Sequence, residues 1–245
     1  MYKLIIFLLI LCVNIKTNAK EPKLVVGIVV DQMRYDYVDR FWNNFSNNGF
    51  KKIVNNGYFL KNTHFSYLPT YTGPGHASIF TGTTPSNHGI IANNWYDKNL
   101  KQSVYCAGNG EMHTICNCSQ EVEDVVSSDG KMSPHHMLTT TIGDEIQLFN
   151  PSSKVIGVSL KDRGAILPAG HAANAAYWMD SEGKWITSSF YMNNLPDYVE
   201  KINDNNPSQN YLKGVWSVKG EFSHNLDNLL RLKILSYYIL LFFLR

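Results

Sequence analysis

The sequence predicts an α/β fold built on a mostly parallel sheet. Two continuous runs, KLVVGIVV at 23–30 and KVIGVSL at 154–160, have the composition of strands that are buried on both faces. Segments with helical features separate these runs, and an alternation of strands and helices is typical of a parallel sheet covered by helices. The length of 245 residues suits one such domain or a large part of a bigger one.

The charge distribution excludes one class of function. The formal net charge is +2, and the lysines and arginines are scattered along the chain rather than gathered in one run. Nucleic-acid-binding domains carry a basic patch that holds the phosphate backbone. We therefore expect no nucleic-acid partner, and any positive charge that serves a function must act locally.

Residues 1–19 have the layout of a secretory signal peptide. Lys3 supplies a short basic region, an apolar core runs from Leu4 to Val13, and small residues precede Ala19. The apolar core is well short of the roughly 20 residues that span a bilayer, so an uncleaved anchor is the less favoured alternative. We expect cleavage near Ala19, export to the periplasm or the exterior, and a mature chain without a membrane span.

The first predicted strand ends at Asp31. In open α/β sheets ligands bind beyond the carboxyl ends of the strands, so a carboxylate at this point is well placed to hold a metal. An N-cap for the segment RYDYVDRFW is an equally good interpretation of the same residue. Helices are predicted at 35–45 and 49–55, and the alternating aromatic residues of 58–67 predict a strand.

The segment 68–97, LPTYTGPGHASIFTGTTPSNHGIIANNWYD, predicts a helix that begins at Thr72. Pro74 is suited to a first helical turn, and Gly73 and Gly75 allow close approach of the backbone to a ligand. Unsatisfied N–H groups at a helix start favour an anion, which would lie beside the Thr72 hydroxyl. The alternative is a Gly/Pro loop that caps an ordinary helix. Asn93 is an exposed amide candidate in the loop that follows.

Residues 99–135 are predicted to be an insertion dominated by loops. They contain the three cysteines that remain after export, namely Cys106, Cys116 and Cys118. We expect one disulfide, between Cys106 and either Cys116 or Cys118, and one free thiol. A metal site that includes His113 is a less favoured alternative.

The second half of the chain supplies positive charge at a strand end. A helix is predicted from Ser133 to about Phe149, and the strand at 154–160 is followed by Lys161, Asp162 and Arg163. Lys161 and Arg163 would complete an anion pocket with Asp31 and Thr72 if both strands end at one edge of the sheet; a solvated strand end is the alternative. The segments 175–180 and 184–191 predict a hairpin, and irregular structure is expected beyond residue 193.

Three motifs in order, VVGIVVDQMRYDY, PTYTGPGHASIFTGTTPSNHGIIANNWYD and VIGVSLKDRGAILPAGH, resemble the alkaline phosphatase superfamily. Within it, the sequence is most similar to the phosphate-irrepressible alkaline phosphatases of bacteria, which are related to the nucleotide pyrophosphatase/phosphodiesterases. The resemblance covers about residues 23–226. It implies a doubly wound, mostly parallel sheet, two zinc ions, and hydrolysis of phosphate monoesters through a phospho-threonine intermediate.

The same resemblance implies roles for individual residues. Thr72 is expected to be the nucleophile and, with Asp31, a zinc ligand, while Asn93 holds a phosphoryl oxygen. Lys161 and Arg163 correspond to the cationic pair of the monoesterases, and a phosphodiesterase or nucleotide pyrophosphatase is the alternative. The resemblance implies no zinc-ligand role for the other histidines near the motifs, which are His64, His76, His88, His135, His136 and His171.

The sequence departs from this family in one respect. The remaining zinc ligands of the family, a D...H pair, an adjacent DH pair and a final histidine, lie downstream of the segment that is present. We therefore expect residues 20–228 to be the N-terminal part of a catalytic domain, with a sheet that is incomplete at the C-terminus. Residues 229–245, LLRLKILSYYILLFFLR, are expected to be an aberrant apolar tail, as a frameshift would produce. The chain is expected to be a zinc-dependent phosphatase by family that is inactive as it stands, and a noncatalytic fragment is a further alternative.

Overall fold

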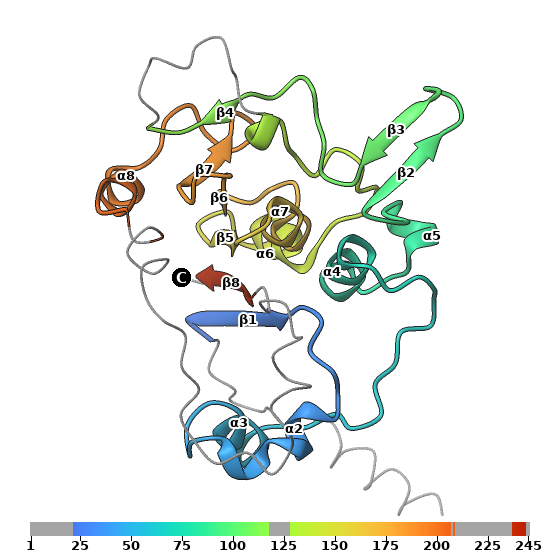
Figure 1. The fold of residues 1–245 in the computed structure, drawn as a ribbon, viewed down its shortest axis with the longest axis vertical. Coiled ribbons are helices and arrows are strands. Elements are labelled where there is room, and N and C mark those ends of the chain that lie inside the picture. Colours follow the sequence, from blue (N-terminus) through green and yellow to red (C-terminus); the bar gives the residue numbers. More distant parts are fainter. Residues whose placement is uncertain (1–21, 118–127, 207, 209–236, 244–245) are drawn as a thin grey trace, which may run out of the picture.

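The structure, a computed structural model, describes residues 22–117, 128–206, 208 and 237–243 (Figure 1). The predicted signal peptide and Cys118 lie outside the described residues, and so does most of the predicted apolar tail. No described helix has the length and apolar character needed to cross a bilayer.

Helices and strands alternate along much of the chain, as the sequence predicts. The strands are β1 (Leu24–Val30), β2 (Asn94–Asp97), β3 (Gln102–Tyr105), β4 (Thr114–Ile115), β5 (Lys154–Ser159), β6 (Ala175–Met179), β7 (Trp185–Ser188) and β8 (Tyr237–Phe243). The helices are α2 (Tyr37–Arg40), α3 (Phe50–Asn56), α4 (Thr72–Thr81), α5 (Pro85–His88), α6 (Ile142–Phe149), α7 (Asp162–Ala169) and α8 (Asp197–Asp204), with short 3-10 turns at Trp42–Asn44 and Ser128–Gly130.

The main sheet has the strand order β1-β8-β5-β6-β7-β4. β5 and β6 are parallel, while β8 is antiparallel to both of its neighbours and β7 is antiparallel to β6 and β4. The described part of the sheet is therefore mixed, with helices packed against it. β2 and β3 form a separate antiparallel hairpin.

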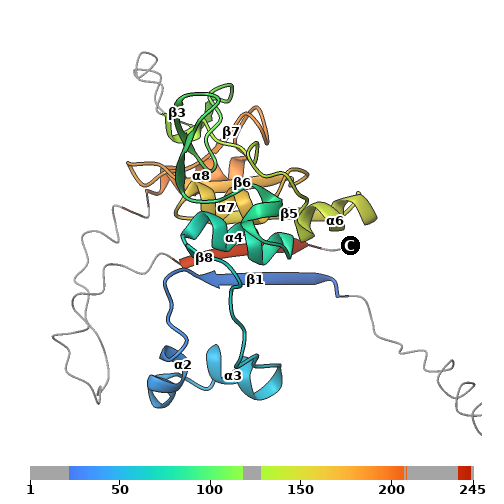
Figure 2. The same ribbon diagram turned by 90° about the vertical axis from the view of Figure 1, so that its right-hand side faces the viewer.

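The register of β8 aligns the ends of its two neighbours. Val30, the last residue of β1, pairs with Tyr237, and Ser159, the last residue of β5, pairs with Tyr238. β1 and β5 thus run in the same direction and end at the same edge of the sheet, one strand apart, as Figure 2 shows. Since β6 is parallel to β5, its carboxyl end lies at this edge as well.

Helix α7 packs closely on the centre of the sheet and shapes the main core. A Cβ atom at Gly157 in β5 would overlap the carbonyl oxygen of Ala165, so the close approach of α7 requires a glycine there. The core cluster around this contact contains Phe80, Ala107, Val155, Ala165, Ile166, Ala169, Ala176, Trp178 and Ile186. Helix α4 contributes Phe80 and lies beside α7, which brings the starts of these two helices into one region (Figure 1).

The prediction that β1 is buried on both faces is wrong for the described structure. Leu24 and Ile28 are 48% and 61% exposed, although Val29 packs against the main core. The reason is that β1 lies at the end of the strand order, where its one strand neighbour is β8. Helices α2 and α3 lie beyond β1, away from β8, and neither contains a buried residue (Figures 1 and 2).

Two other predicted elements differ from the structure. Residues 58–67 are an irregular segment rather than a strand. The helix predicted from Ser133 begins only at Ile142, because Thr141 and Asp144 form a capping box in which each side chain accepts the other's backbone N–H. This capping box fixes the start of α6 one turn before Ile146, which packs against the main core.

Regular structure also occurs where the sequence predicts loops. Part of the predicted insertion at 99–135 forms β3 and β4, and the segment beyond residue 193 contains α8. Residues 237–243 of the predicted apolar tail form β8. The predicted hairpin is confirmed as β6 and β7, and the strand at 154–160 is confirmed as β5.

The predicted pairing of Cys106 is wrong. Cys106 is a free thiol with no exposed surface, packed with Ala77, Ile90, Met137 and Leu167. Cys116 is disulfide-bonded. Cys106 behaves as a small apolar residue of the core, which is the ordinary environment of a reduced cysteine.

Candidate active site at the carboxyl edge of the sheet

Thr72 is the first residue of α4, and its hydroxyl contacts the end of β1. Tyr71, the N-cap, has extended backbone geometry, so the chain turns into the helix at Thr72, as predicted. The Thr72 Oγ1 donates a hydrogen bond to Oδ2 of Asp31 at 3.1 Å. The fold therefore brings together two site residues that are 41 positions apart in the sequence.

Asn93 is held against the same helix start. Its Oδ1 accepts a hydrogen bond from the backbone N–H of Gly73 at 2.7 Å. This contact fixes which end of the carboxamide faces the helix, so the NH2 group of Asn93 is the end available to donate to a ligand. A Cβ atom at residue 73 would lie 3.1 Å from both Asn93 Oδ1 and Cys106 Sγ, so this close packing favours glycine.

Arg163 belongs to a second group of polar contacts, at the start of α7. Its Nη1 donates to the hydroxyl of Tyr105 at 3.0 Å, and that hydroxyl donates to Oδ1 of Asp162 at 2.6 Å. Burial, followed by the charge of Asp162, raises the pKa of Tyr105 well above its usual value. The phenol is consequently neutral at physiological pH and can bridge the carboxylate and the guanidinium.

Lys161 and Arg163 line one cavity of about 220 Å³, here called the anion pocket. It lies at the carboxyl ends of β5 and β6 and is lined by Tyr105, Asp129, Met132, Lys161, Asp162, Arg163, Trp178, Met179, Asp180 and Ser181. The carboxylates of Asp129 and Asp180 accept backbone N–H groups of the β6–β7 turn. The cationic pair predicted at the end of β5 thus lines a cavity, in which Arg163 is half-buried and Lys161 is exposed to solvent. Asp31 and Thr72, which were expected to share this pocket, are not among its lining residues.

His76 and Cys106 connect the two groups of contacts. The buried His76 donates from Nδ1 to the carbonyl oxygen of Thr72 at 2.8 Å. Burial lowers the pKa of His76, and the charges of Asp31 and Arg163 act on it in opposite directions, so this imidazole lies within the field of both groups. Cys106 follows Tyr105 in the sequence, contacts the Gly73 site through Sγ and donates its N–H to the Asn93 carbonyl.

The described residues do not make a zinc site. Among them, no group of three or more His, Cys, Asp or Glu side chains is placed to hold a metal ion. Asp31 and Thr72 supply two candidate ligands, whereas a catalytic zinc normally has about three from the protein.

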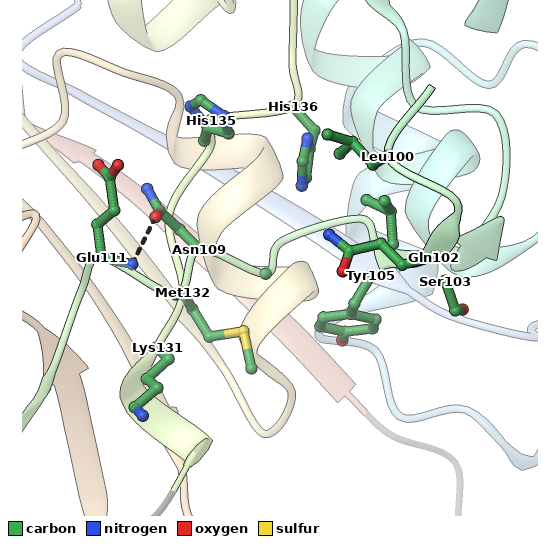
Figure 3. Close-up of a pocket in the computed structure, with 13 residues that line it drawn as sticks. Leu100, Gln102, Ser103, Tyr105, Asn109, Glu111, Lys131, Met132, His135 and His136 are labelled. Carbon is green, nitrogen blue, oxygen red and sulfur yellow. Dashed lines mark hydrogen bonds between the residues drawn. The ribbon is translucent and has the colours of Figure 1, made fainter. Parts of the chain in front are cut away.

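A second cavity, of about 400 Å³, lies on the other side of Tyr105 and Met132, which line both cavities. His135, His136, Leu100 and Gln102 form much of its wall, with Asn109, Glu111 and Lys131 opposite (Figure 3). Burial, followed by the neighbouring His135, lowers the pKa of His136. Neither this cavity nor Tyr105 was predicted, because 99–135 was expected to be loop. The neighbouring Val104 and Tyr105, whose residue types favour strands, were the available signal, and they pair with 94–95 in the hairpin.

Comparison with known proteins supports the family indicated by the motifs. The model of the family described as "Type I phosphodiesterase / nucleotide pyrophosphatase" matches residues 25–236. The chain is 46% identical over 205 residues to alkaline phosphatase PafA of Elizabethkingia meningoseptica and 46% identical over 199 residues to alkaline phosphatase PhoV of Synechococcus elongatus. These matches cover 82% and 80% of this chain but 36% and 35% of the relatives, so the chain spans about a third of their length.

The fold is also that of a known phosphatase over the matched part. The crystal structure of wild-type PafA superposes with a TM-score of 0.76 at 45% identity, covering 83% of this chain and 38% of that one. A PafA variant with substitutions at one threonine, one asparagine, one lysine and one arginine superposes with a TM-score of 0.72 at 42% identity and covers 78% and 36% of the two chains. The α/β, alkaline-phosphatase-like fold expected from the sequence is confirmed for the shared part.

Proposed function

Because the chain belongs to the type I phosphodiesterase / nucleotide pyrophosphatase family, we propose that it carries the phosphoryl-binding part of an exported alkaline phosphatase site. The observation that carries this proposal is the arrangement of Thr72. Its hydroxyl lies at a helix start against Asp31 and next to the amide of Asn93. Its helix α4 packs against α7, which carries Arg163 in its first turn beside the pocket.

In this proposal each residue has one task. Thr72 Oγ is the group that receives the phosphoryl group, with formation of an O–P bond as the bond to the alcohol breaks. The NH2 group of Asn93 holds one phosphoryl oxygen. Arg163 binds two oxygens with a forked contact while Lys161 acts as a point charge. Positioning and charge stabilisation of this kind are the main demands of phosphoryl transfer.

The cationic pair favours a phosphate monoester as the substrate. A monoester dianion presents nonbridging oxygens to both Lys161 and Arg163, whereas a diester has one of its oxygens capped. A phosphodiesterase or nucleotide pyrophosphatase is the second candidate, supported by the description of the family. The substituted residues of the PafA variant are of the same four types as Thr72, Asn93, Lys161 and Arg163, which supports the monoesterase assignment.

Asp31 and Thr72 are the two residues of the described chain that we propose as zinc ligands. The zinc ions of such an enzyme would need further ligands from outside the described residues. We therefore propose that the chain alone binds phosphate without catalysing turnover. Export, with cleavage near Ala19, is part of the same proposal and is testable by N-terminal sequencing of the protein recovered outside the cytoplasm.

The test compares the chain alone with a chimera in which it replaces the aligned segment of PafA. We expect the chain to leave p-nitrophenyl phosphate intact with or without added zinc, and the chimera to hydrolyse it. Thr72→Ala in the chimera should lower kcat/KM by at least about a thousandfold.

A matched pair of substrates separates the two candidate functions. Lys161→Ala and Arg163→Ala should reduce hydrolysis of p-nitrophenyl phosphate much more than hydrolysis of bis(p-nitrophenyl) phosphate. Equal losses on both substrates would favour the phosphodiesterase. A Thr72→Ala chimera with unchanged turnover would show that Thr72 is not the nucleophile.

A further inference from the structure

Tyr105 is the one tyrosine that lines both cavities, and its hydroxyl joins β3 to the start of α7. The phenol ring forms part of the wall of the larger cavity (Figure 3), and its oxygen contacts residues 57 and 58 positions away along the chain. Tyr105 lies outside the three sequence motifs that resemble the alkaline phosphatase superfamily. Its contacts nevertheless involve one of the proposed substrate-binding residues directly.

The hydrogen bonds of the Tyr105 hydroxyl have only one possible direction. A carboxylate can only accept and a guanidinium can only donate, so the hydroxyl donates its proton to Asp162 at 2.6 Å and accepts from Arg163 Nη1 at 3.0 Å. Both are bonds to charged partners, which are shorter and stronger than bonds between neutral groups. The hydroxyl oxygen therefore has a fixed orientation toward Arg163.

Asp162 is itself anchored to the helix. The same Oδ1 that accepts from Tyr105 also accepts the backbone N–H of Arg163 at 2.6 Å, in the first turn of α7. The three residues form a closed set of contacts in which the helix holds the carboxylate, the carboxylate orients the phenol and the phenol holds the guanidinium. Such a network defines the position of a long side chain that would otherwise sample many rotamers.

We propose that Tyr105, oriented by Asp162, is a positioning residue that holds the Arg163 guanidinium at the anion pocket before a phosphoryl group binds. This inference rests on the proposed function of Arg163. Holding the guanidinium in place lowers the conformational cost of binding an oxyanion. The hydrogen bond to Tyr105 uses one of the five N–H donors of the guanidinium, so the other four stay available. Because the phenol lies between Asp162 and Arg163, the carboxylate does not bind Nη1 directly in place of the substrate.

Binding of inorganic phosphate to the full chain tests the proposal. Trp178 lines the anion pocket, so its indole signal in a ¹⁵N-tryptophan-labelled chain reports occupancy during a titration at constant ionic strength. We expect Tyr105→Phe to weaken phosphate binding about fivefold to tenfold, because a bond to a charged group is lost. Tyr96→Phe is the matched control, since Tyr96 lies on the neighbouring strand of the same hairpin and is 64% exposed. The affinity of this variant for inorganic phosphate should stay within about twofold of that of the wild type.

A double-mutant cycle with Arg163→Ala separates this inference from the proposed function. Arg163→Ala should weaken binding, and Tyr105→Phe should cause no further loss in that background. If Arg163→Ala leaves the affinity unchanged, the proposed role of Arg163 is wrong. If Arg163→Ala weakens binding but Tyr105→Phe does not, or if Tyr105→Phe has the same effect with and without Arg163, the positioning role is wrong.

A measurement on the unsubstituted chain covers the case in which Tyr105→Phe fails to fold. In ¹⁵N-arginine-labelled protein, a held guanidinium rotates slowly about its Nε–Cζ bond and gives separate Nη1 and Nη2 signals on cooling. Arg163→Lys identifies the signals of Arg163 by their loss. Averaged Nη signals for Arg163 at all temperatures would overturn the proposal.

Discussion

At the scale of single residues, the start of α4 depends on how little space surrounds Gly73. The backbone N–H of Gly73 donates to Asn93, and the Sγ of the buried Cys106 lies on the other side. Burial is the main reason that the pKa of Cys106 is raised, to about 12, so the thiol is uncharged at neutral pH. An apolar thiol can therefore pack directly behind the helix start without adding charge to the site.

Two glycines in the same helical turn allow a matched test of this packing. Gly73→Ala should destabilise the chain by about 1–3 kcal/mol, because the new methyl group would press on Asn93 and Cys106 in a filled space. Gly75→Ala should instead stabilise it by about 0.5–1 kcal/mol, since nothing lies within 4 Å of a Cβ there and alanine favours a helix. Urea unfolding monitored by circular dichroism measures both. Equal effects of the two substitutions would contradict the close approach at Gly73.

At the scale of elements, the junction of α6 and α7 is held by one carboxylate. Asp144 accepts the backbone N–H groups of Thr141 and Ala172 and lies 3.5 Å from Nδ1 of His171. A Cβ atom at Gly170, which has a φ of 86°, would overlap Asp144 and Thr141, so the turn after α7 also requires glycine. The start of one helix and the end of the other are thus fixed by the same side chain.

This junction should make stability depend on pH. The hydrogen bond with Asp144 raises the pKa of His171, so its contribution to stability is complete below the unfolded value of about 6.5 and is lost as the pH rises through the folded pKa. Burial alone would raise the pKa of Asp144. Hydrogen bonds from His171, Ala172 and Thr141 outweigh burial, so the pKa of Asp144 is lowered. The contribution of Asp144 is therefore present above its unfolded pKa of 3.8 and is lost as the pH falls through the folded value.

The measurement is the urea midpoint at about pH 5.5 and about pH 8.5, on either side of the unfolded His171 pKa. At the lower pH, the urea midpoint of the wild type should be higher than that of His171→Gln. At the higher pH, the midpoints of the two proteins should be nearly equal. A difference between them that is independent of pH would show that His171 contributes through packing rather than charge.

Elements with a strong local signal were predicted from the sequence, and those defined by distant contacts were not. α4, β5 and the β6–β7 hairpin follow from turn residues and apolar runs in their own segments. The start of α6 was misplaced because its capping box outweighs the helical periodicity that precedes it. β8 was not predicted, since its pairing with β1 joins residues more than 200 positions apart, and no local pattern encodes such a contact.

The site was predicted to a similar extent. Among the residues chosen for their chemistry, Asp31 and Lys161 come after strands, Thr72 and Arg163 lie in the first turns of helices, and Asn93 lies just before β2. The cavity of Lys161 and Arg163 is not lined by the other three, so the expected single pocket is not seen. Tyr105 was missed because its importance arises from hydrogen bonds to α7, not from its own sequence context. The roles of these residues in catalysis stay predictions.

At the scale of the whole molecule, β8 joins the two parts of the sheet that carry the site. Leu240 pairs with Gly27 of β1 on one side and with Gly157 of β5 on the other. Asp31 follows β1, and Lys161 and Arg163 follow β5. Among the described strands, β8 is the one that lies between these two and pairs with both.

Proline at residue 240 should disrupt this connection. A proline within a central strand removes a ladder hydrogen bond and should lower the free energy of unfolding by about 3 kcal/mol or more. Leu240→Ala, which keeps the backbone N–H, is the control for the loss of the side chain. Urea unfolding and size-exclusion chromatography measure stability and association through the freed strand edges. An unchanged midpoint and elution volume for Leu240→Pro would contradict the placement of β8 in the sheet.

The width of the site is therefore set by backbone geometry. Neighbouring strands lie about 4.8 Å apart, so β8 holds the ends of β1 and β5 about 10 Å from each other. Direct pairing of β1 with β5 would halve this separation, so within the described sheet β8 acts as the spacer between the residue that follows β1 and the residues that follow β5.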